Sequence, residues 1–162
     1  MGTRTRGFAN LIGANGPISL PSGVGGKVLQ VVTATYNVNT TTTSTSYVTS
    51  GLEVSITPSS ASNKVLIIAN GVGNNSGVNT HTAFTLFRSS TNLSNDDAMS
   101  HLYSNTGAHR SQFAMNYLDS PNTTSSTTYS VRFKSNAGNE TATAHQNDSM
   151  SSIIAMEISV WL

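Results

Sequence analysis

The chain has 162 residues, of which 36% are hydrophobic and only 9% are charged, and its formal net charge is +1. It contains no cysteine, which excludes disulfide bonds and thiolate chemistry, and its balanced charge gives no electrostatic reason to expect nucleic acid or a membrane as a partner. Ser, Thr and Asn replace the missing charges, and clear apolar runs remain between them, so we expect a folded domain rather than a disordered chain.

Residues 1–26 differ from the rest of the chain, since they contain two prolines and several glycines and show little periodicity. This composition predicts an extended N-terminal arm. Two interpretations of it stand, a frayed terminus and an arm that becomes ordered on a partner. We favour an anchoring arm because a purely solvated tail rarely carries apolar side chains such as Phe8, Leu11, Ile12, Ile18 and Leu20.

From Lys27 onward the sequence predicts β-strands, which would form one domain over residues 27–162. Apolar and polar residues alternate in GLEVSITP (51–58), SQFAMNYLDS (111–120) and TTYSVRFKS (127–135), and the last of these places Arg132 and Lys134 on its polar side. Successive side chains of a strand point to opposite faces, and one buried face with one solvated face is typical of antiparallel sheets.

The C-terminal segment SIIAMEISVWL (152–162) alternates in the same way. It places Ile154, Met156 and Ile158 on one apolar face, with Glu157 and Ser159 opposite. Trp161 falls on the polar face, where it would either pack in a small secondary core or anchor a subunit interface, a role in which Trp is enriched.

Two further segments, KVLQVV (27–32) and KVLIIANG (64–71), are apolar on both faces. Such strands are covered twice, here by the other sheet and by either the arm or another subunit. We predict a subunit interface, with the candidate residues Val28, Val65, Ile67 and Trp161.

Turn-forming segments separate about eight predicted strands, and no long segment shows helical periodicity. This pattern predicts an all-β, antiparallel β-sandwich, most simply an eight-stranded jelly roll. The Ser/Thr tract at 39–46 is interpreted as a twisted pair of edge strands joined by a polar turn, because Thr suits exposed strands.

Motifs for chemistry are missing from the sequence: there is no G-x-S-x-G, H-E-x-x-H or phosphate-binding loop. We therefore expect no enzyme, no cofactor and no metal ligand set. The polar segment SHLYSNTGAHR (100–110) is the candidate binding loop, with His101, Tyr103, His109 and Arg110 as residues that could hold a sugar. His101 and His109 either face each other, across a hairpin or a threefold axis, or are placed there by chance.

Four segments taken in order resemble a domain of virion structural proteins of tailed bacteriophages. They are GGKVLQVVTATYNVNTTTTSTSYVTSGLEVSITPSSASNKVLI (25–67), FTLFRSSTNL (84–93), NYLDSPNTTSSTTYSVRFKS (116–135) and IIAMEISVWL (153–162). In those proteins the domain typically closes a tail fibre or related appendage. The resemblance implies a trimeric jelly-roll head, similar to tumour-necrosis-factor-like domains, and no enzyme. Because only about 26 residues precede the domain here, we expect a small appendage, a docked fibre tip or a capsid decoration protein.

The leading hypothesis is therefore a virion protein, assembled in the host cytoplasm, whose homotrimeric knob is attached through the arm to other tail or capsid proteins. As a fibre tip it would bind host surface glycan or protein, and as a decoration protein it would stabilise the assembled capsid. The alternative is a stand-alone carbohydrate-binding or hydrolytic β-sandwich, which predicts a monomer with an aromatic-lined sugar site.

Overall fold

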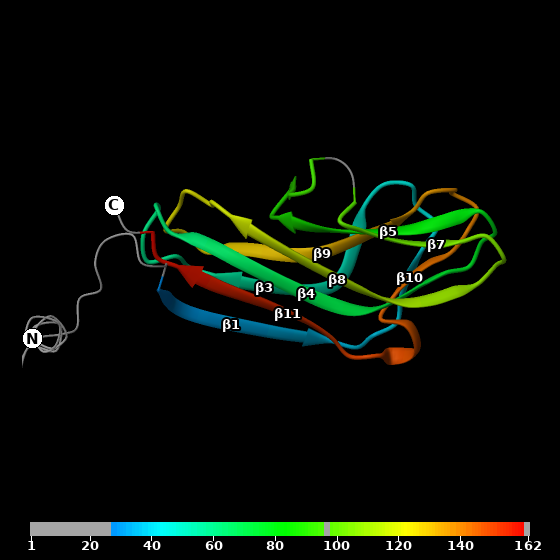
Figure 1. The fold of residues 1–162 in the computed structure, drawn as a ribbon, viewed down its shortest axis with the longest axis horizontal. Coiled ribbons are helices and arrows are strands. Elements are labelled where there is room, and N and C mark those ends of the chain that lie inside the picture. The colour runs from blue at the N-terminus through cyan, green and yellow to red at the C-terminus, as the bar shows by residue number, and fades with distance from the viewer. Residues whose placement is uncertain (1–26, 96–97, 161–162) are drawn as a thin grey trace, which may run out of the picture.

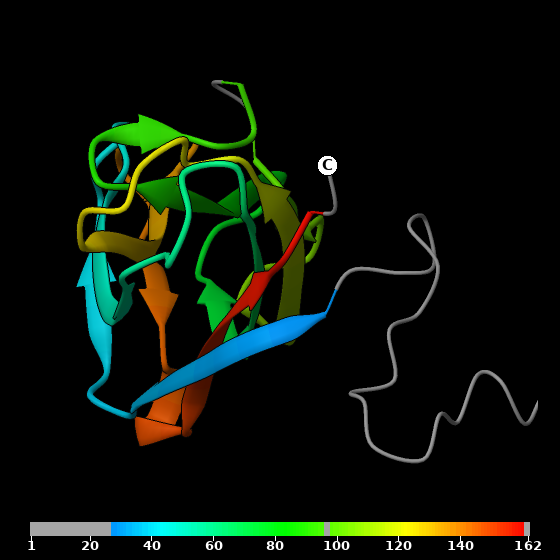
Figure 2. The ribbon, with the colours of Figure 1, turned by 90° about the vertical axis from the view of Figure 1, so that its left-hand side faces the viewer.

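A computed structural model describes residues 27–95 and 98–160, and within them the predicted all-β, antiparallel sandwich is confirmed. Two sheets pack face to face in an elongated body (Figure 1), and a view along its long axis shows the two layers (Figure 2). The proposed arm, with Phe8, Leu11, Ile12, Ile18 and Leu20, lies outside the described residues.

Sheet A has six strands, and β4 lies at its centre. Its path runs β1 (Val28–Tyr36), β11 (Ser151–Ile158), β4 (Lys64–Asn75), β10 (Ala142–Ala144) and β2 (Thr40–Thr42), and β8 (His109–Asp119) also pairs with β4. Sheet B has five strands, β3 (Val48–Ile56), β9 (Thr127–Ser135), β5 (Thr80–Arg88) and β6 (Thr91–Asn92) along its path, with β7 (Ser100–Ser104) paired to β5. A 3₁₀ turn, η1 (Gln146–Asp148), precedes β11.

The core lies between the sheets, where the alternating strands place their apolar side chains. Tyr129, Val131 and Phe133 of β9 have no exposed area, as their alternation with polar neighbours predicts. The ring of Phe84 on β5 stacks on Phe113 of β8 at 4.4 Å between centroids, which joins the two sheets. These rings pack directly against the β4 backbone at Gly71 and Gly73, where a Cβ atom would lie less than 3 Å from Phe113 or Phe84. Glycine therefore occupies both positions.

The polar tract forms edge strands, but the two strands belong to different sheets. β2 is the last strand of sheet A, where it pairs with β10, and β3 begins just after the tract as the edge of sheet B. The prediction of edge strands is confirmed, whereas their pairing with each other is wrong. The hydroxyl-rich segment 43–47 crosses between the sheets, so its side chains do not need burial on both faces.

β11 reverses the expected orientation of the C-terminal segment. Ile153, Ala155 and Glu157 point into the sandwich, whereas Ile154 and Met156 are only partly buried on the outside. The alternation is correct, but the face that carries the carboxylate is the buried one. The buried Glu157 is tolerated because it is fully hydrogen-bonded, as described below.

The two ends of the sandwich differ. β1 begins and β11 ends at the same end, next to the position where residues 1–26 join the domain (Figure 1). The opposite end carries the turns that connect β4 with β5, β7 with β8, and β9 with β10. An attachment through the N-terminal segment would therefore leave these turns pointing away from the attachment point.

Candidate functional site

Sheet A carries an apolar surface on the side that faces away from sheet B. One row of cross-strand neighbours spans four strands, from Val31 on β1 through Met156 and Leu66 to Leu118 on β8. We call this surface the outer face of sheet A and define it by its apolar residues, namely Val28, Leu29, Val31, Leu66, Ile68, Leu118, Ile154, Met156 and Ile158.

These apolar side chains remain accessible in the single chain. Val31 is 51% exposed, Leu118 50% and Val28 48%, and Leu66 and Met156 between them are partly buried. The solvated face of an antiparallel sheet is usually polar, and contiguous apolar patches of this kind mark interaction surfaces. The outer face of sheet A is thus the candidate assembly surface of the molecule.

The predicted interface residues divide between three places. Val28 lies on the outer face of sheet A, where its place in an interface stays a prediction, but Val65 and Ile67 have no exposed area because they point into the core between the sheets. Their assignment to an interface is therefore wrong. β4 is apolar on both faces, and the residues that point outward are Leu66 and Ile68. Trp161 lies outside the described residues.

The candidate loop residues fall on two strands rather than on one loop. His101 and Tyr103 lie on β7 in sheet B, where the ring of His101 is 4.5 Å from that of His81 and the hydroxyl of Tyr103 donates to Asn79 Oδ1 at 3.2 Å. Within the described part of the chain, His101 therefore contacts His81, and its contact with His109 around a threefold axis stays a prediction. The cross-strand register brings these rings together, which the linear sequence does not reveal.

His109 and Arg110 begin β8 in sheet A, close to the end of the sandwich that carries the turns. The amide oxygen of Asn147, placed toward the guanidinium, accepts from both Nη1 and Nη2 of Arg110 at 3.1 Å. Arg110 thus tethers the turn η1, and the four candidate residues do not form a single site.

A histidine and a serine lie in hydrogen-bond contact inside the domain, as a nucleophile and its base would. His145 Nδ1 is 2.7 Å from Ser151 Oγ, and Nε2 is 2.9 Å from the carbonyl oxygen of Ser50. The carbonyl can only accept, so Nε2 carries the proton and Ser151 donates to Nδ1. Burial lowers the pKa of His145. Both side chains have no exposed area, so this pair is a structural contact that no substrate reaches.

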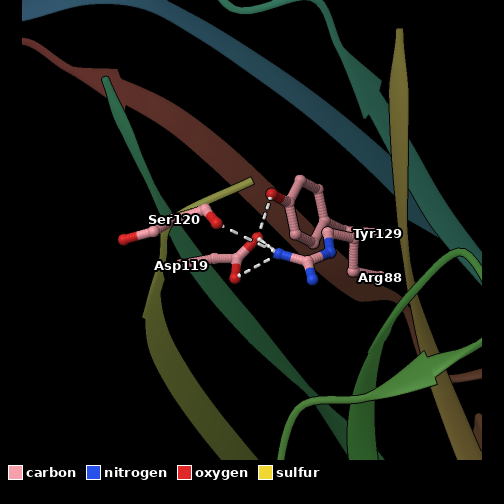
Figure 3. A network of polar contacts seen from close by, with 4 residues as sticks. All are labelled: Arg88, Asp119, Ser120 and Tyr129. Atoms are coloured by element: carbon pink, nitrogen blue, oxygen red, sulfur yellow. Dashed lines mark hydrogen bonds and ion pairs between the residues drawn. The ribbon is translucent and has the colours of Figure 1, made fainter. Parts of the chain in front are cut away.

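Two further polar networks lie inside the sandwich. Arg88, Asp119 and Tyr129 form one of them at the end where the chain enters (Figure 3). In the other, the Glu157 carboxylate accepts from the side chains of Gln30 and Asn63 and from both the amide and the hydroxyl of Ser59. Burial alone would raise the pKa of Glu157, but these hydrogen bonds outweigh it and hold the pKa at about 2. Both networks join segments that are far apart in the sequence, and both are structural.

The outer side of sheet B contains a polar hollow that the sequence analysis did not identify. Its volume is about 420 Å³, and it is lined by Thr45, Ser46, Tyr47, Phe87, Ser90, Asn92, Arg132 and Lys134. Arg132 and Lys134 come from the polar side of β9, and Tyr47 immediately precedes β3. Two features of the sequence could have indicated this hollow. Arg132 and Lys134 lie on one face of a predicted strand, and Tyr47 follows the polar tract at 39–46.

The chain was compared with known proteins. No family model matches it, and no curated protein matches it either. Within residues 27–95 and 98–160, no three His, Asp or Glu side chains come together as a metal site would require, and no helix there is long and apolar enough to cross a bilayer.

Proposed function

We propose that the chain is a structural protein of a bacteriophage virion, a homotrimeric β-sandwich knob attached to the particle through residues 1–26. The observation that supports assembly is the row from Val31 to Leu118, in which four neighbouring strands present apolar side chains outward. A chain with 9% charged residues and a net charge of +1 has little electrostatic repulsion to oppose the contact of copies through such a face.

We infer the virion location and the threefold symmetry from the resemblance of the sequence to appendage domains of tailed phages. We infer the assembly face from the apolar outer face of sheet A. Of the two roles, a tip that contacts the host is favoured over a capsid decoration protein. The hollow on sheet B is our reason, since it offers charged, aromatic and hydroxyl groups on the surface opposite the assembly face. A decoration protein needs only contacts to the capsid.

The oligomeric state is tested with the full chain by native mass spectrometry and sedimentation at micromolar concentration. We expect a trimer, and we expect Leu66→Lys and Met156→Lys each to give a folded monomer, because every copy would have to bury an unpaired ammonium group in the contact. The matched control is Ser55→Lys on the exposed side of β3, which should remain trimeric. A wild-type monomer, or lysine variants that stay trimeric, would refute the assembly face.

The attachment is tested on particles. Antibodies against the knob should label tail appendages in electron micrographs, and deletion of residues 1–24 should leave a folded trimer that no longer joins the particle. Labelling spread over the capsid would reassign the protein as a decoration protein. Normal incorporation of the truncated chain would refute the anchoring arm.

The stand-alone carbohydrate-binding domain is the second candidate, because the hollow on sheet B contains an aromatic ring beside polar side chains. It predicts a monomer that binds sugar and is absent from any particle. The same mass measurement therefore separates the two candidates.

A further inference from the structure

The hollow on sheet B supports the proposed role as a host-contacting tip, and its lining residues indicate the kind of ligand that it would bind. Its floor is Phe87 on β5, and Arg132 and Lys134 on β9 and Tyr47 before β3 stand around it. Its volume of about 420 Å³ falls in the range of small-ligand sites, which extends from about 300 to 1,000 Å³.

The cations of the hollow are held by aromatic rings. The Arg132 guanidinium carbon lies 4.2 Å from the centroid of the Phe87 ring, and the Lys134 ammonium nitrogen lies 4.6 Å from that of Tyr47. The Tyr47 and Phe87 rings meet edge to face at 5.8 Å, so the four side chains form one continuous series of contacts. A backbone carbonyl fixes the guanidinium further, since Arg132 Nη2 donates to Ser89 O at 3.0 Å. Both cations are thus positioned in advance.

Neither cation is neutralised within the described part of the chain. The ion pair found there joins Arg88 to Asp119 on a different side of the sandwich, and the described residues that line the hollow include no acid. Arg132 Nε is buried and has no hydrogen-bond partner among the described residues. A buried donor without an acceptor costs about 1–3 kcal/mol, so the arrangement is not optimal for stability alone.

The remaining lining groups indicate the kind of anion. Ser46, Ser90 and Thr45 offer hydroxyls, which are groups that hydrogen-bond to sugar hydroxyls. A planar guanidinium beside an ammonium suits a carboxylate. Two cations on a chain of net charge +1 are few for a nucleic acid backbone, whose binding rests on several phosphate contacts.

We propose that this hollow binds the carboxylate-bearing sugar residue of an acidic cell-surface polysaccharide, with Arg132 and Lys134 on the carboxylate and Tyr47 as the apolar wall. This inference rests on the proposed role as a host-contacting tip. The same sheet face continues from Lys134 past Ala83 to His101, which lies against His81. A polysaccharide chain would extend over these rings, so the site includes one of the predicted binding residues.

The test uses the full-length protein and isothermal titration with a tetramer of galacturonic acid, with a neutral galactose tetramer as the matched ligand. We expect the acidic tetramer to bind and the neutral one to bind at least about tenfold more weakly. Arg132→Gln and Lys134→Gln should each weaken the acidic tetramer about tenfold, which corresponds to about 1.4 kcal/mol. The control is Arg110→Gln, which removes an exposed cation from sheet A and should leave the affinity unchanged.

If Arg132→Gln does not fold, Lys134→Gln alone tests the site. We expect Lys134→Gln to fold, because the contact described for the Lys134 ammonium is with the Tyr47 ring only. A third ligand, galactose 6-phosphate, distinguishes carboxylate from phosphate, and tighter binding of the phosphate would overturn the carboxylate assignment. Equal binding of acidic and neutral tetramers, no binding, or unchanged affinity in both glutamine variants would overturn the site. Because the mass of each sample is measured as well, a trimer without this binding refutes the site and leaves the assembly proposal intact.

Discussion

The guanidinium of Arg88 on β5 and the carboxylate of Asp119 at the end of β8 join the two sheets, with Nη1 2.8 Å from Oδ1 and 2.9 Å from Oδ2. The hydroxyl of Tyr129 donates to the same carboxylate at 2.7 Å (Figure 3). Asp119 is only 5% exposed and Tyr129 is fully buried. This contact therefore closes the sandwich at the end where the N-terminal segment enters.

Replacing Asp119 with Asn should destabilise the domain, because the amide keeps the shape but leaves the Arg88 charge without its counter-ion. Removing one partner of a buried pair costs about 3–5 kcal/mol, and since the Arg88 side chain is 29% exposed we expect about 2 kcal/mol. Urea unfolding of the full chain measures the change. The control is Glu53→Gln, an exposed acid on β3, which should stay within about 0.5 kcal/mol of the wild type. Equal stability of both variants would show that the ion pair contributes nothing.

Glu157 should make stability depend on pH in the acid range. Its pKa is held at about 2 in the folded protein against an ordinary value of 4.5, so the folded state favours the ionised form. The resulting stability is present above pH 4.5 and is lost as the pH falls through about 2, and it amounts to roughly 3 kcal/mol. Glu157→Gln should be less stable at neutral pH and should show a flatter stability curve between pH 4.5 and 2. Glu53→Gln should retain the wild-type slope, and loss of that slope in this control would contradict the assignment.

His145 should make the stability of the domain depend on pH below about 6.5. Burial lowers its pKa below the ordinary 6.5, so the unfolded chain binds a proton more readily than the folded protein does. The contribution of neutral His145 is therefore complete above pH 6.5 and declines as the pH falls below it. His145→Asn suits the left-handed backbone there, where φ is 57°, and should remove this part of the slope. His109→Asn, at an exposed position of β8, serves as the comparison and should leave the slope unchanged.

How far the sequence predicts this fold is clear from two strands. In β9 every second residue is apolar and its neighbours are polar, so alternation assigns Tyr129, Val131 and Phe133 to the core correctly. In β11 the inward-pointing and the outward-pointing residues both include apolar side chains. Alternation alone therefore assigns Ile154 and Met156, rather than Ile153 and Ala155, to the core. The deciding contacts are the hydrogen bonds that Gln30 and Asn63 donate to Glu157 from distant parts of the chain, and no local pattern predicts them.

The hollow on sheet B likewise depends on the pairing of strands that are far apart in the sequence, which no local pattern predicts. The sequence places Arg132 and Lys134 on one face of a strand, but the position of Tyr47 beside them follows from the pairing of Val48 with Phe133. For the outer face of sheet A, the sequence predicts two segments, 27–32 and 64–71, that are each apolar on both faces. Which of their residues point outward depends on the neighbouring strands, and for this reason Val65 and Ile67 were assigned to the wrong side.

Gly73 on β4 should not accept a side chain. A Cβ atom at this position would lie 2.6 Å from Cζ of Phe84 and 2.7 Å from Cδ1 of Leu102, closer than carbon atoms pack. Gly73→Ala should therefore destabilise the domain by about 1–3 kcal/mol, although alanine is otherwise favoured over glycine in a strand.

The cause of this loss can be isolated with a double-mutant cycle. Phe84→Leu removes the ring atoms nearest to the added methyl group, so the double variant Gly73→Ala/Phe84→Leu should lose less stability than the sum of the single variants, by at least about 0.5 kcal/mol. Urea unfolding at neutral pH measures all three. Strictly additive losses would mean that the ring does not oppose the methyl group, and that a backbone requirement of β4 explains the glycine instead.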